Sequence, residues 1–178
     1  MGRTALIVTD MLNHYEHEDA DKLVKSVEQV LPNVVALRDR AVEEGVPVIY
    51  VNDNHDEWES NRQRLVEGAL EGARRDLVEP ILPRDDDLFL SKTRHSAFYA
   101  TPVEHILDQE GIDRIVLVGQ VAEQCILYSA LDAYIRHIDV AVPRDAVAHI
   151  QEDLAEAALR MMQTNMRADI VSASECLR

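Results

Sequence analysis

The chain has 178 residues, of which 47% are hydrophobic and 29% are charged, a profile typical of a soluble globular protein large enough to fold without a disulfide or metal. Asp and Glu total 33 against 18 Lys and Arg, which gives a formal charge of −15. This charge disfavours nucleic acids and anionic membrane surfaces as partners, because both require a basic face on the protein.

The cysteine count and the start of the chain point to a cytoplasmic protein. Two cysteines, Cys125 and Cys176, are too few for a disulfide framework. The first residues lead directly into an apolar strand, no signal peptide fits there, and no apolar run is long enough to span a bilayer. We therefore expect reduced thiols, and neither a membrane nor a nucleic acid as partner.

Short apolar runs alternate with helical patterns along the chain. We expect strands at residues 5–8, 46–51, 87–90, 115–118, 138–142 and 170–171, and helices at 21–44, 101–111, 122–136 and 151–167. Pro32 should kink the first helix or start a new turn. Residues 55–83 are expected to form a long connection with one short helix. The last helix should bury one face, made of Leu154, Ala158, Met161, Met162 and Met166.

Strands that alternate with helices favour right-handed crossover units and a mainly parallel sheet covered on both faces. The strands are nearly pure Val, Ile and Leu, as burial on both sides requires. The predicted fold class is therefore α/β, with a six-stranded sheet in a single three-layer α/β/α domain over residues 1–178, similar to a Rossmann fold.

Reactive side chains follow several of these strands. Asp10 follows the first, Lys92 the third, and Cys125 comes a few residues after the fourth. Ligands of such folds bind at the carboxyl edge of the sheet, where the three side chains could meet. There Asp10 could accept the thiol proton, and Lys92 and a helix start could stabilise a thiolate. The alternatives are a buried cysteine, a turn-forming aspartate and a solvated lysine.

Three sequence motifs carry a resemblance to a known family. Residues 8–11 (Val-Thr-Asp-Met), 92–98 (Lys-Thr-Arg-His-Ser-Ala-Phe) and 119–126 (Gly-Gln-Val-Ala-Glu-Gln-Cys-Ile) resemble those of isochorismatase-like cysteine hydrolases, which include nicotinamidases and N-carbamoylsarcosine amidohydrolase. The resemblance covers nearly the whole chain and implies an isochorismatase-like fold. It also implies an Asp10, Lys92 and Cys125 catalytic triad. A non-proline cis peptide is implied at Val121–Ala122, with the N–H groups of Ala122 and Cys125 as the oxyanion hole.

The chain also departs from the family pattern. Leu12 replaces a common glutamine, and Ala122 replaces a common threonine. Asp53 and His55 resemble half of the metal site of nicotinamidases, but no further histidine precedes Lys92, so we expect no metal and no cofactor. The family's tendency to form dimers and tetramers implies a homo-oligomer.

Further side chains are candidates for substrate binding: Leu12, Tyr15, His55, Trp58, Arg94 and Gln120. Arg94 could clamp a carboxylate or form a structural ion pair. Trp58 could serve as a lid, a subunit contact or loop packing. Because the vinyl-ether reaction of isochorismatases needs no cysteine nucleophile, Cys125 favours C–N bond hydrolysis. The expected small-molecule substrate is an amide or ureido compound. The alternatives are vinyl-ether hydrolysis, with Asp10 as general acid, and a non-catalytic metabolite-binding protein.

Overall fold

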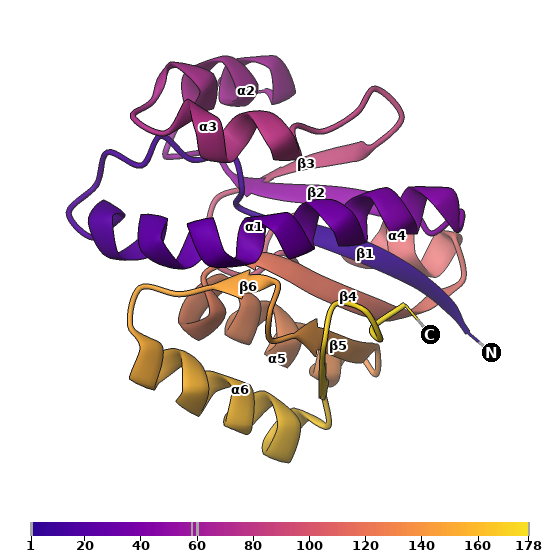
Figure 1. Cartoon of the computed structure of the whole chain (residues 1–178). Coiled ribbons are helices and arrows are strands. Elements are labelled where there is room, and N and C mark those ends of the chain that lie inside the picture. The colour runs from indigo at the N-terminus through magenta and orange to yellow at the C-terminus, as the bar shows by residue number, and fades with distance from the viewer. Residues whose placement is uncertain (1, 58, 60, 178) are drawn as a thin grey trace.

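A parallel β-sheet forms the centre of the molecule (Figure 1). The structure, a computed structural model, describes residues 2–57, 59 and 61–177. The sheet has the order β3-β2-β1-β4-β5-β7, with β6 paired to β4, and every strand pairing is parallel. The strands are β1 (Arg3–Thr9), β2 (Val48–Asp53), β3 (Leu88–Lys92), β4 (Ile112–Gln120), β5 (Asp139–Pro143), β6 (Val147–Ala148) and β7 (Asp169–Val171).

Helices cover both faces of the sheet and complete the expected three layers. They are α1 (Ala20–Glu43), α2 (Arg62–Glu71), α3 (Arg75–Val78), α4 (Val103–Gln109), α5 (Leu127–Ile135) and α6 (Glu152–Met166). In β1, Leu6 and Val8 pack on the α1–α3 side, whereas Ala5 and Ile7 pack on the α4–α6 side. The alternation of buried side chains to two faces explains the purely apolar strand sequence.

The sheet has seven strands, one more than the six expected. The additional strand, β6, consists of only Val147 and Ala148, which pair with Gly119 and Gln120 of β4. Two residues are too short to produce a recognisable periodic pattern. Among the described residues, no helix is long and apolar enough to cross a membrane.

The helical regions before β3 match the expectation in part. Helix α1 continues through Pro32 as one element, with Val30, Leu31 and Val34 buried around the proline. The connection before β3 holds α2, α3 and a 3₁₀ turn (Glu79–Ile81) in place of one short helix. The Asn61 side chain caps α2 by accepting a hydrogen bond from the N–H of Arg64.

The buried face of α6 differs from the expected one at two positions. Ala158, Met162 and Met166 are buried as expected, whereas Leu154 and Met161 are exposed and Ala155 and Leu159 are buried in their place. Both sets have helical spacing, so periodicity alone did not identify which one faces the sheet. Alanine, with its small side chain, lets α6 lie close to the neighbouring layer.

Candidate active site

The carboxyl ends of four strands bring the reactive side chains to one edge of the sheet. Asp53 and Lys92 pair directly at the ends of β2 and β3, and Thr9 of β1 pairs with both Val51 and Gly119. Because the strands are parallel, the residues that follow them lie at the same edge. Asp10, which follows Thr9, therefore lies between the ends of β2 and β4.

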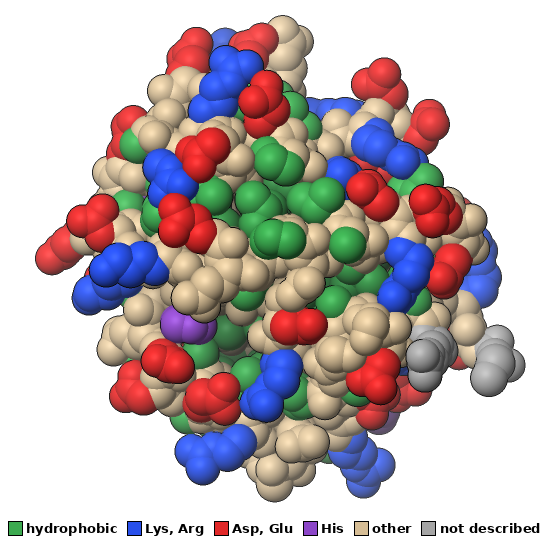
Figure 2. Space-filling view, in the orientation of Figure 1, with side chains coloured by type: hydrophobic (Ala, Val, Ile, Leu, Met, Phe, Trp, Pro, Cys, Tyr) green, Lys and Arg blue, Asp and Glu red, His purple; other side chains and the backbone are tan. Residues whose placement is uncertain are grey.

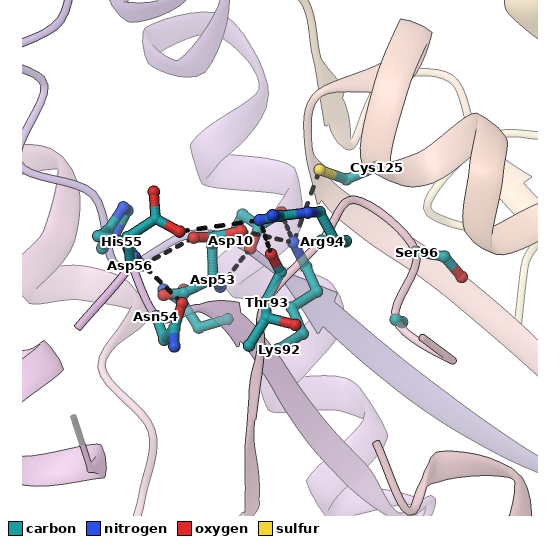
Figure 3. Close-up of polar contacts among 12 residues, drawn as sticks. Asp10, Asp53, Asn54, His55, Asp56, Lys92, Thr93, Arg94, Ser96 and Cys125 are labelled. Atoms are coloured by element: carbon teal, nitrogen blue, oxygen red, sulfur yellow. Dashed lines mark hydrogen bonds and ion pairs between the residues drawn. The ribbon is translucent and has the colours of Figure 1, made fainter. Parts of the chain in front are cut away.

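Lys92 is the centre of this cluster. Its side chain is almost fully buried, and Nζ lies 2.9 Å from Oδ2 of Asp10, 3.7 Å from Sγ of Cys125 and 3.5 Å from Oδ2 of Asp53. The expected convergence of Asp10, Lys92 and Cys125 is confirmed by these distances (Figure 3). The ion pair between Lys92 and Asp53 adds a second carboxylate, which the sequence analysis did not assign to the lysine.

The surroundings set the charge of the lysine and of the thiol. Burial alone lowers the pKa of Lys92, but the carboxylates of Asp10 and Asp53 outweigh it, so the pKa is raised and the ammonium stays charged. Burial also raises the pKa of the Cys125 thiol, the Asp10 carboxylate raises it further, and Lys92 opposes them only in part. Cys125 is therefore a protonated thiol at rest, because desolvation outweighs the thiolate stabilisation expected from Lys92.

A buried hydrogen-bond network holds Asp10. Its N–H donates to the Val51 carbonyl at 3.1 Å, and its Oδ1 accepts from the N–H of Asp53 at 2.7 Å. Gln120 Nε2 donates to the Asp10 carbonyl at 2.5 Å, and the Tyr15 hydroxyl donates to Gln120 Oε1 at 3.4 Å. Gln120 and Tyr15, both expected to bind substrate, are thus engaged with the protein itself.

The turn that carries Cys125 starts at the end of β4. The cis peptide bond joins Gln120 to Val121, one bond earlier than the expected Val121–Ala122 bond. Gln120 still pairs with Ala148 of β6, so the chain leaves the sheet directly after it. Residues 122–126 then form a π-helical turn before α5 in place of a continuous helix. The Val121 carbonyl accepts hydrogen bonds from the N–H groups of residues 124 and 126.

A pocket of about 320 Å³ opens beside the thiol. Its lining comes from three of the strand ends, the start of α1, the π-helical turn and the segment after β6: Asp10, Asn13, His17, Asp19, Leu23, Asp53, His55, Gln120, Val121, Gln124, Cys125 and Ile150. His55 thus lies where the sequence analysis expected it. His17, Asp19, Leu23 and Ile150 were missed, because no motif marks them. Gln124 was missed although it lies within the motif at residues 119–126, directly before Cys125.

Three other substrate-binding candidates do not line this pocket in the described structure. Leu12 is 1% exposed in the core, and its N–H and carbonyl bind the Asn52 side chain. Tyr15 is likewise buried. Arg94 is largely exposed, donates to the Thr93 carbonyl and lies 3.7 Å from Asp56, which supports the ion-pair interpretation (Figure 3). The remaining candidate, Trp58, lies outside the described residues.

The residues around Asp53 do not form a metal site. Its Oδ1 accepts the N–H of His55 at 2.7 Å, and its Oδ2 faces the Lys92 ammonium. The Nε2 atom of His55 lies 3.4 Å from the Leu12 carbonyl. Within the described part of the chain, no three His, Cys, Asp or Glu side chains are placed to hold a metal ion. The donor set is therefore too small for the zinc or iron ion suggested by the Asp53 and His55 pair.

Comparison with known proteins identifies the family. The model of the isochorismatase domain matches residues 4–175. The chain belongs to the isochorismatase family. It is 30% identical to YaaI, an uncharacterized isochorismatase family protein of Bacillus subtilis, over 97% of this chain and 96% of YaaI.

Solved structures of the family agree with the fold described above. The nicotinamidase PncA of Bacillus subtilis superposes with a TM-score of 0.75 at 26% identity, covering 96% of this chain and 99% of PncA. The N-carbamoylsarcosine amidase of Thermoplasma acidophilum superposes with a TM-score of 0.72 at 26% identity, covering 97% of this chain and 98% of the amidase.

Proposed function

We propose that this isochorismatase-family protein is a cysteine hydrolase that cleaves a C–N bond in a small amide or ureido compound. The observation that carries the proposal is the buried Lys92 ammonium, which contacts both the Cys125 thiol and the Asp10 carboxylate. A nucleophile, a proton acceptor and a fixed cation at one pocket are the requirements of nucleophilic acyl transfer. The similarity to a nicotinamidase and an amidase supports this reaction class.

The first half of the reaction forms an acyl-enzyme. Asp10 accepts the Cys125 proton as Sγ attacks the substrate carbonyl carbon, and Lys92 stabilises the developing thiolate. Backbone N–H groups of the turn that carries Cys125 receive the oxyanion of the tetrahedral intermediate; the family resemblance implies those of Ala122 and Cys125. When the intermediate collapses, the C–N bond breaks, and the nitrogen takes the proton from Asp10 and leaves as ammonia or an amine.

The second half regenerates the enzyme. Asp10 removes a proton from a water molecule, which attacks the thioester carbonyl carbon. The C–S bond then breaks, the carboxylic or carbamic acid is released, and the Cys125 thiolate recovers a proton from Asp10. Lys92 remains an ammonium throughout, which agrees with its raised pKa.

The decisive experiment compares the two cysteines. A panel of small amides and ureido compounds, with isochorismate included, is assayed with the parent protein, Cys125→Ala and the control Cys176→Ala. We expect amide turnover to fall by at least ~10³-fold in Cys125→Ala, because the nucleophile is lost. Cys176 donates a hydrogen bond to the Ala173 carbonyl near the C-terminus and does not line the pocket. It should therefore be dispensable for turnover.

Other outcomes would support the alternatives. Isochorismate turnover that survives Cys125→Ala would indicate vinyl-ether hydrolysis, with Asp10 as general acid. Absence of turnover with every compound would favour a binding protein. Iodoacetamide labelling followed by mass spectrometry adds a test of the thiol: Cys125, which lines the pocket, should label faster than the fully buried Cys176. Equal labelling would contradict the proposed role of Cys125.

A further inference from the structure

We propose that the pocket selects uncharged or cationic amides and rejects those that carry a carboxylate, with Asp19 as a specificity-determining residue. This inference rests on the proposed function and concerns the charge of the substrate. It follows from the balance of charged side chains that the pocket presents.

The pocket lining is rich in carboxylates. Asp10, Asp19 and Asp53 all line it, and the lining residues include no Lys or Arg within the described part of the chain. Lys92 lies behind the lining and is already paired with Asp10 and Asp53. One ammonium between two carboxylates leaves a net negative charge before Asp19 is counted.

Asp19 is not neutralised inside the pocket. Its partner is Lys22, 3.1 Å away. The Lys22 side chain is 63% exposed and the Asp19 side chain 45% exposed. An exposed ion pair of this kind is weak, because water screens both charges. The N-terminus of α1 also carries a partial positive charge, but this amounts to about half an elementary charge and is smaller than the full charge of Asp19.

A substrate carboxylate would therefore lack a counter-ion in this pocket. Arg94, the candidate clamp from sequence, is directed at Asp56 and does not line the pocket (Figure 3). An ammonium group on the substrate would be attracted to Asp19, whereas a carboxylate would be repelled. Isochorismate carries two carboxylates, so the same charge balance disfavours it as the substrate.

Three primary amides of similar length test this inference at pH 8, where an ordinary imidazole is uncharged. They are 4-aminobutanamide, which is cationic, pentanamide, which is neutral, and succinamate, which is anionic. We expect kcat/KM to be at least ~10-fold higher for the cationic amide than for the anionic one. Asp19→Asn should reduce this ratio by about threefold or more, mainly through KM.

Asp21→Asn is the matched control. It removes the same charge two residues further along α1, from an exposed side chain outside the pocket lining. The ratio of the two kcat/KM values should stay within about twofold of the parent in this variant, because water screens the charge at an exposed position. An equal effect of Asp19→Asn and Asp21→Asn would assign the selectivity to the overall charge and overturn the role of Asp19.

A second measurement ranks the binding of the same three amides without turnover. It records how strongly each amide protects Cys125 from iodoacetamide. Protection in the order cationic, neutral, anionic without hydrolysis of any amide would preserve the charge selectivity and overturn the proposed function. Protection by succinamate equal to or better than that by 4-aminobutanamide would overturn the selectivity while leaving hydrolysis possible. The selectivity would also be overturned if none of the three amides protected the thiol.

Discussion

Asp10 adopts a backbone conformation that is unusual for an aspartate. Its φ of 54° lies in the left-handed region, which costs of order 1–3 kcal/mol for a residue other than glycine. Hydrogen bonds from Gln120 and from the N–H of Asp53, together with the bond to the Val51 carbonyl, hold it there. The carboxylate is thus directed at Lys92 before any substrate enters.

Replacement of Gln120 tests this positioning. Gln120→Leu keeps the side chain buried but removes the donor to the Asp10 carbonyl. We expect kcat on the best amide to fall by about tenfold or more, with KM changed less than threefold, because Asp10 acts in proton transfer. A Tyr15→Phe variant should lose much less activity, because it breaks only the longer bond to Gln120. An unchanged kcat in folded Gln120→Leu would contradict the argument.

Metal content is a second prediction at the residue scale. Asp53 and His55 lack further ligands within the described residues, and Lys92 places a positive charge against Asp53. The purified protein should carry less than ~0.1 equivalent of zinc, iron or manganese, and a chelator should leave amide turnover unchanged. Elemental analysis that finds one metal per chain, with turnover lost on chelation, would show that the expectation is wrong.

At the scale of helices and strands, sequence patterns were most informative where burial is complete. The main strands were found because apolar runs such as residues 115–118 report burial on both faces. Asp10, Lys92 and Cys125 became candidates because strand ends of a parallel sheet share one edge, and the resemblance of their motifs to the family then implied the triad. Asp19 and His17 reach the pocket through an irregular segment after β1, whose path leaves no periodic signal. The two-residue β6, which precedes Ile150, was missed because of its length.

Two glycines with positive φ allow the effect of close packing on stability to be distinguished from the effect of backbone strain. Gly119 has φ of 108°, and a Cβ atom there would lie 2.2 Å from the Thr9 carbonyl oxygen. Gly45 also has positive φ, at 70°, but a Cβ would meet nothing within 4 Å. We expect Gly119→Ala to destabilise the protein by about 3 kcal/mol or more, and Gly45→Ala by only about 1 kcal/mol.

Urea unfolding measures both variants. The larger effect at Gly119 would show that β1 and β4 approach closely beside the active site, so turnover should fall in that variant alone. Equal losses in the two variants would mean that β1 and β4 can separate to accommodate the methyl group. The close approach of Gly119 to Thr9 would then not constrain the position of Asp10.

At the scale of the whole molecule, charged side chains lie mainly at the surface, and many of them form ion pairs. Figure 2 shows acidic and basic side chains interspersed on one face, with apolar side chains between them. Most of the described ion pairs have exposed partners, such as Arg3 with Glu110 and Arg75 with Glu79, and pairs of this kind contribute little to stability. The free energy of folding therefore comes mainly from the two apolar layers beside the sheet.

Buried titratable groups make the folded state sensitive to high pH. Burial raises the pKa of Cys125, Tyr15 and Tyr50, the last to about 12, and neighbouring carboxylates raise that of Lys92. The folded state thus holds these protons more tightly than the unfolded chain does. The unfolded pKa values are 9.0 for cysteine, 10.0 for tyrosine and 10.5 for lysine. Below these values the contribution of each group to stability is constant, and it is lost as the pH rises above them.

The free energy of unfolding in urea should therefore be nearly constant from pH 7 to 8.5 and fall above pH 9. Each group contributes a slope of up to ~1.4 kcal/mol per pH unit once the unfolded form ionises. The two buried cysteines ionise first in the unfolded chain, so Cys125→Ala and Cys176→Ala should each lessen the decline between pH 9 and 10. A constant free energy up to pH 10.5, or an equally steep decline in Cys125→Ala, would contradict a buried protonated thiol at the active site.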